Sequence, residues 1–186
     1  MKQSVIALAI AAVSMPVLAD NANVVNGTSL ATKGESLVNI GRDNNVTGKV
    51  TTVIGQQATA TSNMSVVVGF QAKSEENMTV AIGSGSRVTG NSATAVGKAT
   101  LAEGKASAAF GSHATAKGEV SVAVGQHANA LGGYSTAVGQ ASVAKAQSST
   151  AIGSGATAES RFSTALGTNA HAKNYQDVAV GFGDRK

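Results

Sequence analysis

The feature that most constrains this chain is a glycine that recurs every fourteen residues. Five consecutive blocks between Ser107 and Gly167 read SAAFG, SVAVG, STAVG, STAIG and STALG, without insertion or deletion. An α-helix or a coiled-coil heptad needs no glycine at a fixed interval, so the chain is predicted to be a repeat array of short strand–turn units. Gly27 fits the same spacing, and the glycines expected at the turn of the array are Gly41, Gly55, Gly69, Gly83, Gly97, Gly111, Gly125, Gly139, Gly153, Gly167 and Gly181.

The residues before each glycine predict a strand that is apolar on both faces. From Val53 onward, the residue two places before the glycine is alanine or valine, and the residue directly before it is larger and apolar. Because neighbouring strand residues point to opposite faces, consecutive apolar positions indicate a strand that is covered on both sides. We therefore predict burial for the residues directly before the glycines, which are Ile40, Ile54, Val68, Ile82, Val96, Phe110, Val124, Val138, Ile152, Leu166 and Val180.

The residues after each glycine predict a second strand with one buried and one solvent-exposed face. Small residues stand three and five places after the glycine, as Ala114 and Ala116 do, with a varied polar residue such as Thr115 between them. This alternation has the period of a half-buried strand. A second turn follows and often carries its own glycine, such as Gly118, so we expect positive φ at both turns. A dozen such units, stacked at the spacing of parallel strands, would form a rod of roughly 55 Å.

A thin roll of two sheets has one interior, which covers only one face of the first strand. The other face would form an apolar stripe along the rod, larger than the few hundred Å² that a soluble monomer usually exposes. A parallel homo-oligomer around an axis would bury this stripe. The periodicity leaves the number of copies open.

The N-terminus has the features of a secretory signal peptide, which we assign to residues 1–19. Lys2 precedes an apolar run that is too short to span a membrane, and Val17-Leu18-Ala19 has the small residues of a cleavage site. We expect irregular N-terminal repeats or a cap over 20–55, and regular repeats over 56–186. The chain has no cysteine, only 3% aromatic residues and interspersed charges. This composition indicates neither a disulfide framework nor nucleic-acid binding.

Four units show the repeat most clearly: TVAIGSGS (79–86), SVAVGQHA (121–128), STAVGQAS (135–142) and STAIGSGA (149–156). They resemble the head repeat of the trimeric autotransporter adhesins, the YadA-like family, and the resemblance covers nearly all of the chain after the signal peptide. It implies an all-β, left-handed parallel β-roll of fourteen-residue repeats that assembles as a parallel homotrimer. Family members normally continue into a neck, a coiled-coil stalk and a membrane anchor. Because the sequence ends directly after a repeat, we expect this chain to carry no anchor of its own.

The resemblance also implies a function, that of an adhesin head which is exported to the cell surface or the medium, with the periplasm as another possible location. Its partners would be itself and host matrix proteins such as collagen, fibronectin or laminin, with a possible role in virulence. The alternative is a passive structural spacer or biofilm matrix component without a specific ligand. The sequence contains no nucleophile elbow, phosphate loop or paired carboxylates, so we predict no enzymatic activity and no cofactor.

Ligand contacts are expected among outward-facing polar residues. His113 and His127 occupy the same position of successive units, and a metal site there is conceivable. We favour the simpler interpretation that they are polar residues of an exposed turn, and predict no metal site. The candidate ligand contacts are Lys117, His113, His127, Arg161 and His171.

Overall fold

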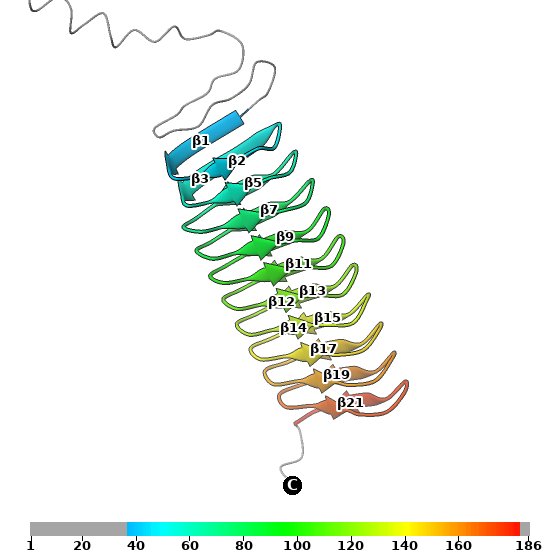
Figure 1. Cartoon of the computed structure of the whole chain (residues 1–186). Coiled ribbons are helices and arrows are strands. Elements are labelled where there is room, and N and C mark those ends of the chain that lie inside the picture. The colour runs from blue at the N-terminus through cyan, green and yellow to red at the C-terminus, as the bar shows by residue number, and fades with distance from the viewer. Residues whose placement is uncertain (1–36, 183–186) are drawn as a thin grey trace, which may run out of the picture.

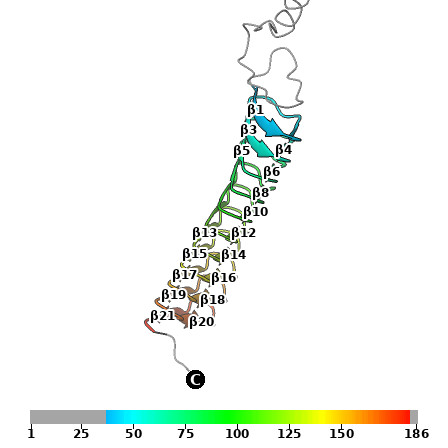
Figure 2. The ribbon, with the colours of Figure 1, turned by 90° about the vertical axis from the view of Figure 1, so that its left-hand side faces the viewer.

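The computed structural model describes residues 37–182, and in this range the fourteen-residue units wind into a parallel β-solenoid (Figure 1). No helix occurs among the described residues. Each coil contributes one strand to each of two sheets, which run side by side along the rod (Figure 2). The assigned signal peptide, Gly27 and residues 183–186 lie outside the described residues.

The odd-numbered strands form one parallel sheet of 11 strands and the even-numbered strands form another of 10. The odd sheet contains β1 (Leu37–Arg42), β3 (Thr51–Gln56), β5 (Val66–Val68), β7 (Val80–Ile82), β9 (Thr94–Val96), β11 (Ala108–Phe110), β13 (Val122–Val124), β15 (Thr136–Val138), β17 (Thr150–Ile152), β19 (Thr164–Leu166) and β21 (Val178–Val180). The even sheet contains β2 (Asn45–Val46), β4 (Thr59–Ala60), β6 (Lys73–Ser74), β8 (Arg87–Val88), β10 (Leu101–Ala102), β12 (Thr115–Ala116), β14 (Asn129–Ala130), β16 (Val143–Ala144), β18 (Thr157–Ala158) and β20 (His171–Ala172).

The register between coils is the sequence period itself. Ala109 pairs with Ala123, which pairs with Ala137 in the next coil, and the same fourteen-residue offset holds in both sheets. Every residue therefore lies beside its equivalent in the coils before and after. The predicted array of strand–turn units is confirmed.

The interior between the two sheets is filled by small side chains. The odd sheet contributes the residues two places before the glycines, from Val53 to Ala165, and all are fully buried. The even sheet contributes the residues three and five places after the glycines, such as Ala114 and Ala116, also fully buried. Thr115 between them is only partly buried, so the predicted alternation of the second strand is confirmed.

The residues directly before the glycines form the face that one chain leaves uncovered, which is the apolar stripe expected of a roll with a single interior. Ile54 and Phe110 are each 40% exposed, and Val68 and Val138 are half-buried. The physical reason is the strand geometry: their neighbours two places before the glycine point into the single interior, so these side chains point out of the solenoid. Their full burial requires a second molecule.

Each coil consists of two similar half-turns joined by two bends. The first bend holds the glycines that recur every fourteen residues, which we call the column glycines, and the second bend follows seven residues later. At the first bend His113 has a φ of 59° and donates its N–H to Lys98 O; at the second, Val120 has a φ of 52° and donates to Lys105 O. Both bends therefore place a residue, usually not glycine, in the left-handed region.

Positive φ occurs at both bends, but the glycines of the two bends are required for different reasons. Gly125, at the first bend, has a φ of 131°. Gly118, at the second bend, is not among the residues with positive φ, but a Cβ there would lie 1.8 Å from the carbonyl oxygen of Gly132 in the next coil. Glycine at the second bend therefore permits close stacking of backbones rather than a special dihedral angle.

Candidate functional site

The first surface that stands out is the outer side of the odd sheet, which we call the apolar face. In each coil from Thr52 to Val180 it presents two residues, one directly before the column glycine and one two positions earlier. The first is always a large apolar residue, and the second is valine, threonine or alanine. Ile54 and Phe110 are each 40% exposed and Leu166 is 43% exposed. Over all its coils the apolar face is on the order of 900 Å², larger than the ~300–600 Å² of the largest apolar patch on a typical monomer.

The outer side of the even sheet, which we call the polar face, carries ion pairs that link successive coils. Glu75 Oε1 lies 2.6 Å from Lys73 Nζ, and Glu75 Oε2 lies 3.1 Å from Arg87 Nη2 in the next coil. Lys117 Nζ lies 3.3 Å from Glu103 Oε2 in the previous coil. The hydrogen bond from Lys73 and the neighbouring Arg87 guanidinium outweigh partial desolvation and lower the pKa of Glu75.

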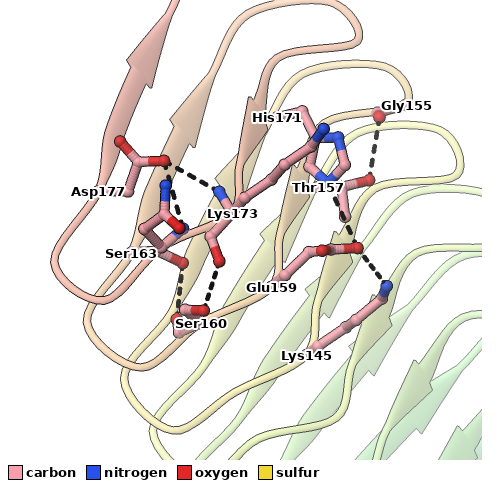
Figure 3. Close-up of polar contacts among 10 residues, drawn as sticks. Lys145, Gly155, Thr157, Glu159, Ser160, Ser163, His171, Lys173 and Asp177 are labelled. Carbon is pink, nitrogen blue, oxygen red and sulfur yellow. Dashed lines mark hydrogen bonds and ion pairs between the residues drawn. The ribbon is translucent and has the colours of Figure 1, made fainter.

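A second cluster on the polar face spans three coils near the C-terminal end (Figure 3). Glu159 Oε1 accepts a hydrogen bond from Lys145 Nζ at 2.6 Å and lies 3.3 Å from His171 Nε2. The hydrogen bond from Lys145, followed by that from His171, lowers the pKa of Glu159. These groups are all partly exposed, so the pairs order the surface more than they stabilise the fold.

The structure separates the five candidate ligand contacts. Lys117 and His171 lie on the polar face, where Lys117 pairs with Glu103 and His171 Nε2 lies 3.3 Å from Glu159 Oε1. His113 and His127 lie at the first bend in adjacent coils, where their rings stack with centroids 4.9 Å apart and an interplanar angle of 17°. Arg161 lies at the second bend, where it donates a hydrogen bond to Gln147 of the previous coil. The candidates therefore form no single site, and their role in ligand binding stays a prediction.

Sequence reasoning missed the carboxylates that hold these cations in place. Glu103 and Glu159 occupy the same coil position as Lys117 and Lys145, one coil away. Opposite charges fourteen residues apart are the signal that could have found these pairs, because the register of the solenoid brings such residues side by side.

The second bend carries a row of large apolar side chains that the sequence reading also overlooked. Tyr134 is 56% exposed and Phe162 is 46% exposed, and both stand two residues after the start of the bend. Tyr175 of the next coil packs edge-on against Phe162, with the ring centroids 5.8 Å apart. Six coils carry a large side chain at this position, and we call these six the second-bend ridge: Val50, Met64, Met78, Val120, Tyr134 and Phe162. The other coils have Ser92, Ala106, Ser148 and Gln176 there.

Two other kinds of site are absent from residues 37–182. No group of three or more histidine, cysteine, aspartate or glutamate side chains is placed to hold a metal ion in this part of the chain. None of the described residues forms a helix of the length and hydropathy needed to cross a membrane.

Comparison with known proteins identifies the repeat. The family model of the YadA head domain repeat matches residues 77–100, 102–128, 130–156 and 158–183, together more than half of the chain. The chain belongs to the YadA head-repeat family. The solved crystal structure of the collagen-binding domain of the Yersinia adhesin YadA is 28% identical, with a TM-score of 0.59, and the match covers 66% of this chain and 68% of that domain. No curated protein sequence matches the chain.

Membership in the YadA head-repeat family confirms the resemblance noted in the repeat motifs and the parallel solenoid fold. It supports an adhesin role, and it implies a location at the surface or outside the cell. The matched coils carry most of the apolar face, the polar face and the second-bend ridge.

Proposed function

We propose that this chain is the head of a cell-surface adhesin, which assembles as a parallel homotrimer and binds host extracellular matrix, with collagen as the first candidate. The observation that supports this proposal best is the similarity to the collagen-binding domain of YadA, which extends over about two thirds of each chain. Export through the segment 1–19 belongs to the same proposal.

The apolar face supports the assembly. Its area of about 900 Å² is close to the ~800 Å² that each partner buries in a standard protein interface. At ~25 cal/mol per Å², its removal from water would contribute on the order of 20 kcal/mol per chain, before the costs of association are deducted. Three copies around a common axis would turn their apolar faces inward and leave three polar faces in solvent.

The polar face supports the binding role. On it charged and polar side chains repeat at the spacing of the coils, interrupted by Leu101 and Val143, and a trimer would present this face three times. Contacts that are individually weak would then add through avidity. Among the candidate contacts, Lys117 and His171 lie on this face, and Arg161 lies beside it at the second bend.

The test is binding of the full-length chain to immobilised collagen, fibronectin and laminin, with its mass measured by light scattering. We expect a trimer that binds at least one of the three proteins, and collagen first. A stable monomer would refute the assembly. A trimer that binds none of the three would refute the matrix-binding role while leaving the assembly intact.

The second candidate function is a passive spacer without a specific ligand, and the ion pairs of the polar face favour it. Lys117, Lys145 and His171 each have a carboxylate partner within the chain, which reduces the charge that a ligand could meet. The double variant Lys117→Ala/Arg161→Ala separates the two functions. The double variant should bind matrix proteins more weakly if the chain is an adhesin head. If the chain is a passive spacer, the variant should behave like the unaltered chain.

A further inference from the structure

Two histidines stand side by side at the first bend, on the outside of the solenoid. His113 and His127 occupy the same position of adjacent coils, and both side chains are exposed. Their rings stack with centroids 4.9 Å apart and an interplanar angle of 17°. Two imidazoles are therefore presented to solvent in nearly the same orientation.

The backbone fixes the positions from which the two imidazoles project. Both residues lie in the left-handed region, with φ of 59° at His113 and 57° at His127. His113 donates its N–H to Lys98 O at 2.9 Å, and His127 donates its N–H to Ser112 O at 3.0 Å. Each histidine is thus tied to the coil before it, so the pair is largely pre-organised.

A glutamine pair shows that side chains at this position of adjacent coils can reach each other. Gln57 and Gln71 occupy the same position in two earlier coils, with φ of 57° and 54°. Gln71 Nε2 donates a hydrogen bond to Gln57 Oε1 at 3.1 Å. The first bend therefore allows polar atoms of two successive coils to approach to about 3 Å.

Two imidazoles at this spacing suit a divalent transition metal. Imidazole nitrogen is a good ligand for zinc, copper and nickel. Bonds of about 2.0–2.1 Å place two nitrogens on one ion ~3–4 Å apart. The exposed rings of His113 and His127 can reach this separation by turning toward each other about their side-chain bonds, with no movement of the backbone.

The hydroxyl group of Ser112 supports metal binding by His113. Ser112 Oγ lies 2.9 Å from His113 Nδ1. A metal ion on Nε2 selects the tautomer in which Nδ1–H donates to this hydroxyl. A hydrogen bond from the second ring nitrogen is the contact that metal-bound histidines usually make, because it orients the ring.

We propose that His113 and His127 form a chelating site for a divalent transition metal, with Nε2 of His113 and a ring nitrogen of His127 as ligands and water at the remaining positions. Cu²⁺ should bind most tightly, because it heads the affinity order of the divalent first-row metals. With two protein ligands, this site differs from the clusters of three or more that are absent from residues 37–182. It replaces the simpler interpretation of the two histidines, because the stacking of the rings and the contact with Ser112 could not be inferred from the spacing.

Titration of the untagged full-length chain with Cu²⁺ tests the site, with calorimetry for affinity and electron paramagnetic resonance for the number of bound nitrogens. We expect one tightly bound ion per chain with two nitrogen ligands. His127→Gln should weaken binding about tenfold or more and leave one nitrogen, because the second imidazole no longer binds intramolecularly. His171→Gln should leave the tight site unchanged, since His171 lies on the polar face beside Glu159.

Two further variants keep or add histidines and change their spacing. His127→Ala combined with Ala141→His separates the pair by two coils, ~9.6 Å, which is too far for one ion to bridge. This variant should bind Cu²⁺ as weakly as His127→Gln, although the number of histidines is unchanged. Gln57→His/Gln71→His builds the same pair at the equivalent position of earlier coils, and should add one tightly bound ion per chain.

The spacing decides the outcome. Equally tight binding by the chain whose histidines are two coils apart would refute the chelate, and so would a copper signal from a single nitrogen in the unaltered chain. Circular dichroism of each variant should match that of the unaltered chain, because all the altered side chains are exposed or half-buried. The site involves one chain and no matrix protein, so failure of the trimer or of matrix binding would leave it intact.

Discussion

The substitution Gly125→Ala tests why the array needs glycine at the first bend. Gly125 has a φ of 131°, outside the region that L-residues adopt, which costs on the order of 1–3 kcal/mol when a side chain is present. In addition, a Cβ at Gly125 would lie 2.6 Å from the carbonyl oxygen and 2.7 Å from the carbonyl carbon of Gly139. That carbonyl belongs to the backbone of the next coil, which cannot rotate away as a side chain could.

Strain and clash together should destabilise the chain by about 3 kcal/mol or more. For a protein of this size we expect a decrease in Tm of about 6–12 °C. The assay is thermal unfolding followed by circular dichroism at a fixed protein concentration, since association makes Tm depend on concentration.

Gly133→Ala is the matched control, because Gly133 lies in the same coil and changes by the same single methyl group. It is not among the residues with positive φ, and a Cβ there has its nearest contact at 3.9 Å, with Glu119 O. We expect Gly133→Ala to be neutral or to stabilise by up to ~1 kcal/mol, because alanine restricts the unfolded chain. Equal Tm values for Gly125→Ala and Gly133→Ala would refute the structural role assigned to the column glycines.

Two further predictions concern the repeat and its charges. Deleting residues 125–138 removes one whole coil and should leave a soluble, shorter solenoid with an unchanged circular dichroism spectrum per residue, whereas deleting Asn129 alone shifts every later column and should abolish soluble folding; an insoluble product from the first deletion would contradict the repeat model. Because the pKa of Glu75 is lowered in the folded chain, its ion pairs should stabilise the fold above the ordinary carboxyl range and lose this effect as pH falls through the lowered value. Glu75→Gln should therefore cost at most about 0.5–1 kcal/mol at pH 7 and progressively less as the pH falls below the ordinary carboxyl range, and a Tm difference that does not change with pH would exclude this origin.

The sequence contained enough information to predict the solenoid. A period without insertions fixes the register of every strand pair, so Ala109 beside Ala123 follows directly from the spacing of the glycines. The alternation around Thr115 similarly assigned the inner and outer sides of the second strand. Both inferences depend only on the regular geometry of a strand, in which successive side chains point to opposite faces.

The positions that escaped prediction depend on geometry that the repeat does not show. The pattern around Phe110 indicated coverage on both sides and hence a second copy, but it did not show which of the two faces that copy would have to cover. Positive φ at Val120 and His113 was not foreseen, because residues other than glycine rarely adopt the left-handed region and a β-branched residue such as Val120 does so least. These residues adopt it because the N–H of each then bonds to the preceding coil.

The hydrogen bonds between coils have a mechanical consequence for a protein that would hold two surfaces together. Strands cross the rod and their hydrogen bonds run along it, so a pull along the rod separates one coil at a time rather than shearing a whole sheet. A coil that contributes ~4.8 Å to the folded rod would release up to ~48 Å of extended chain. Under tension the head would therefore lengthen stepwise about tenfold, and the apolar contacts between copies would set the force at which the first coil opens.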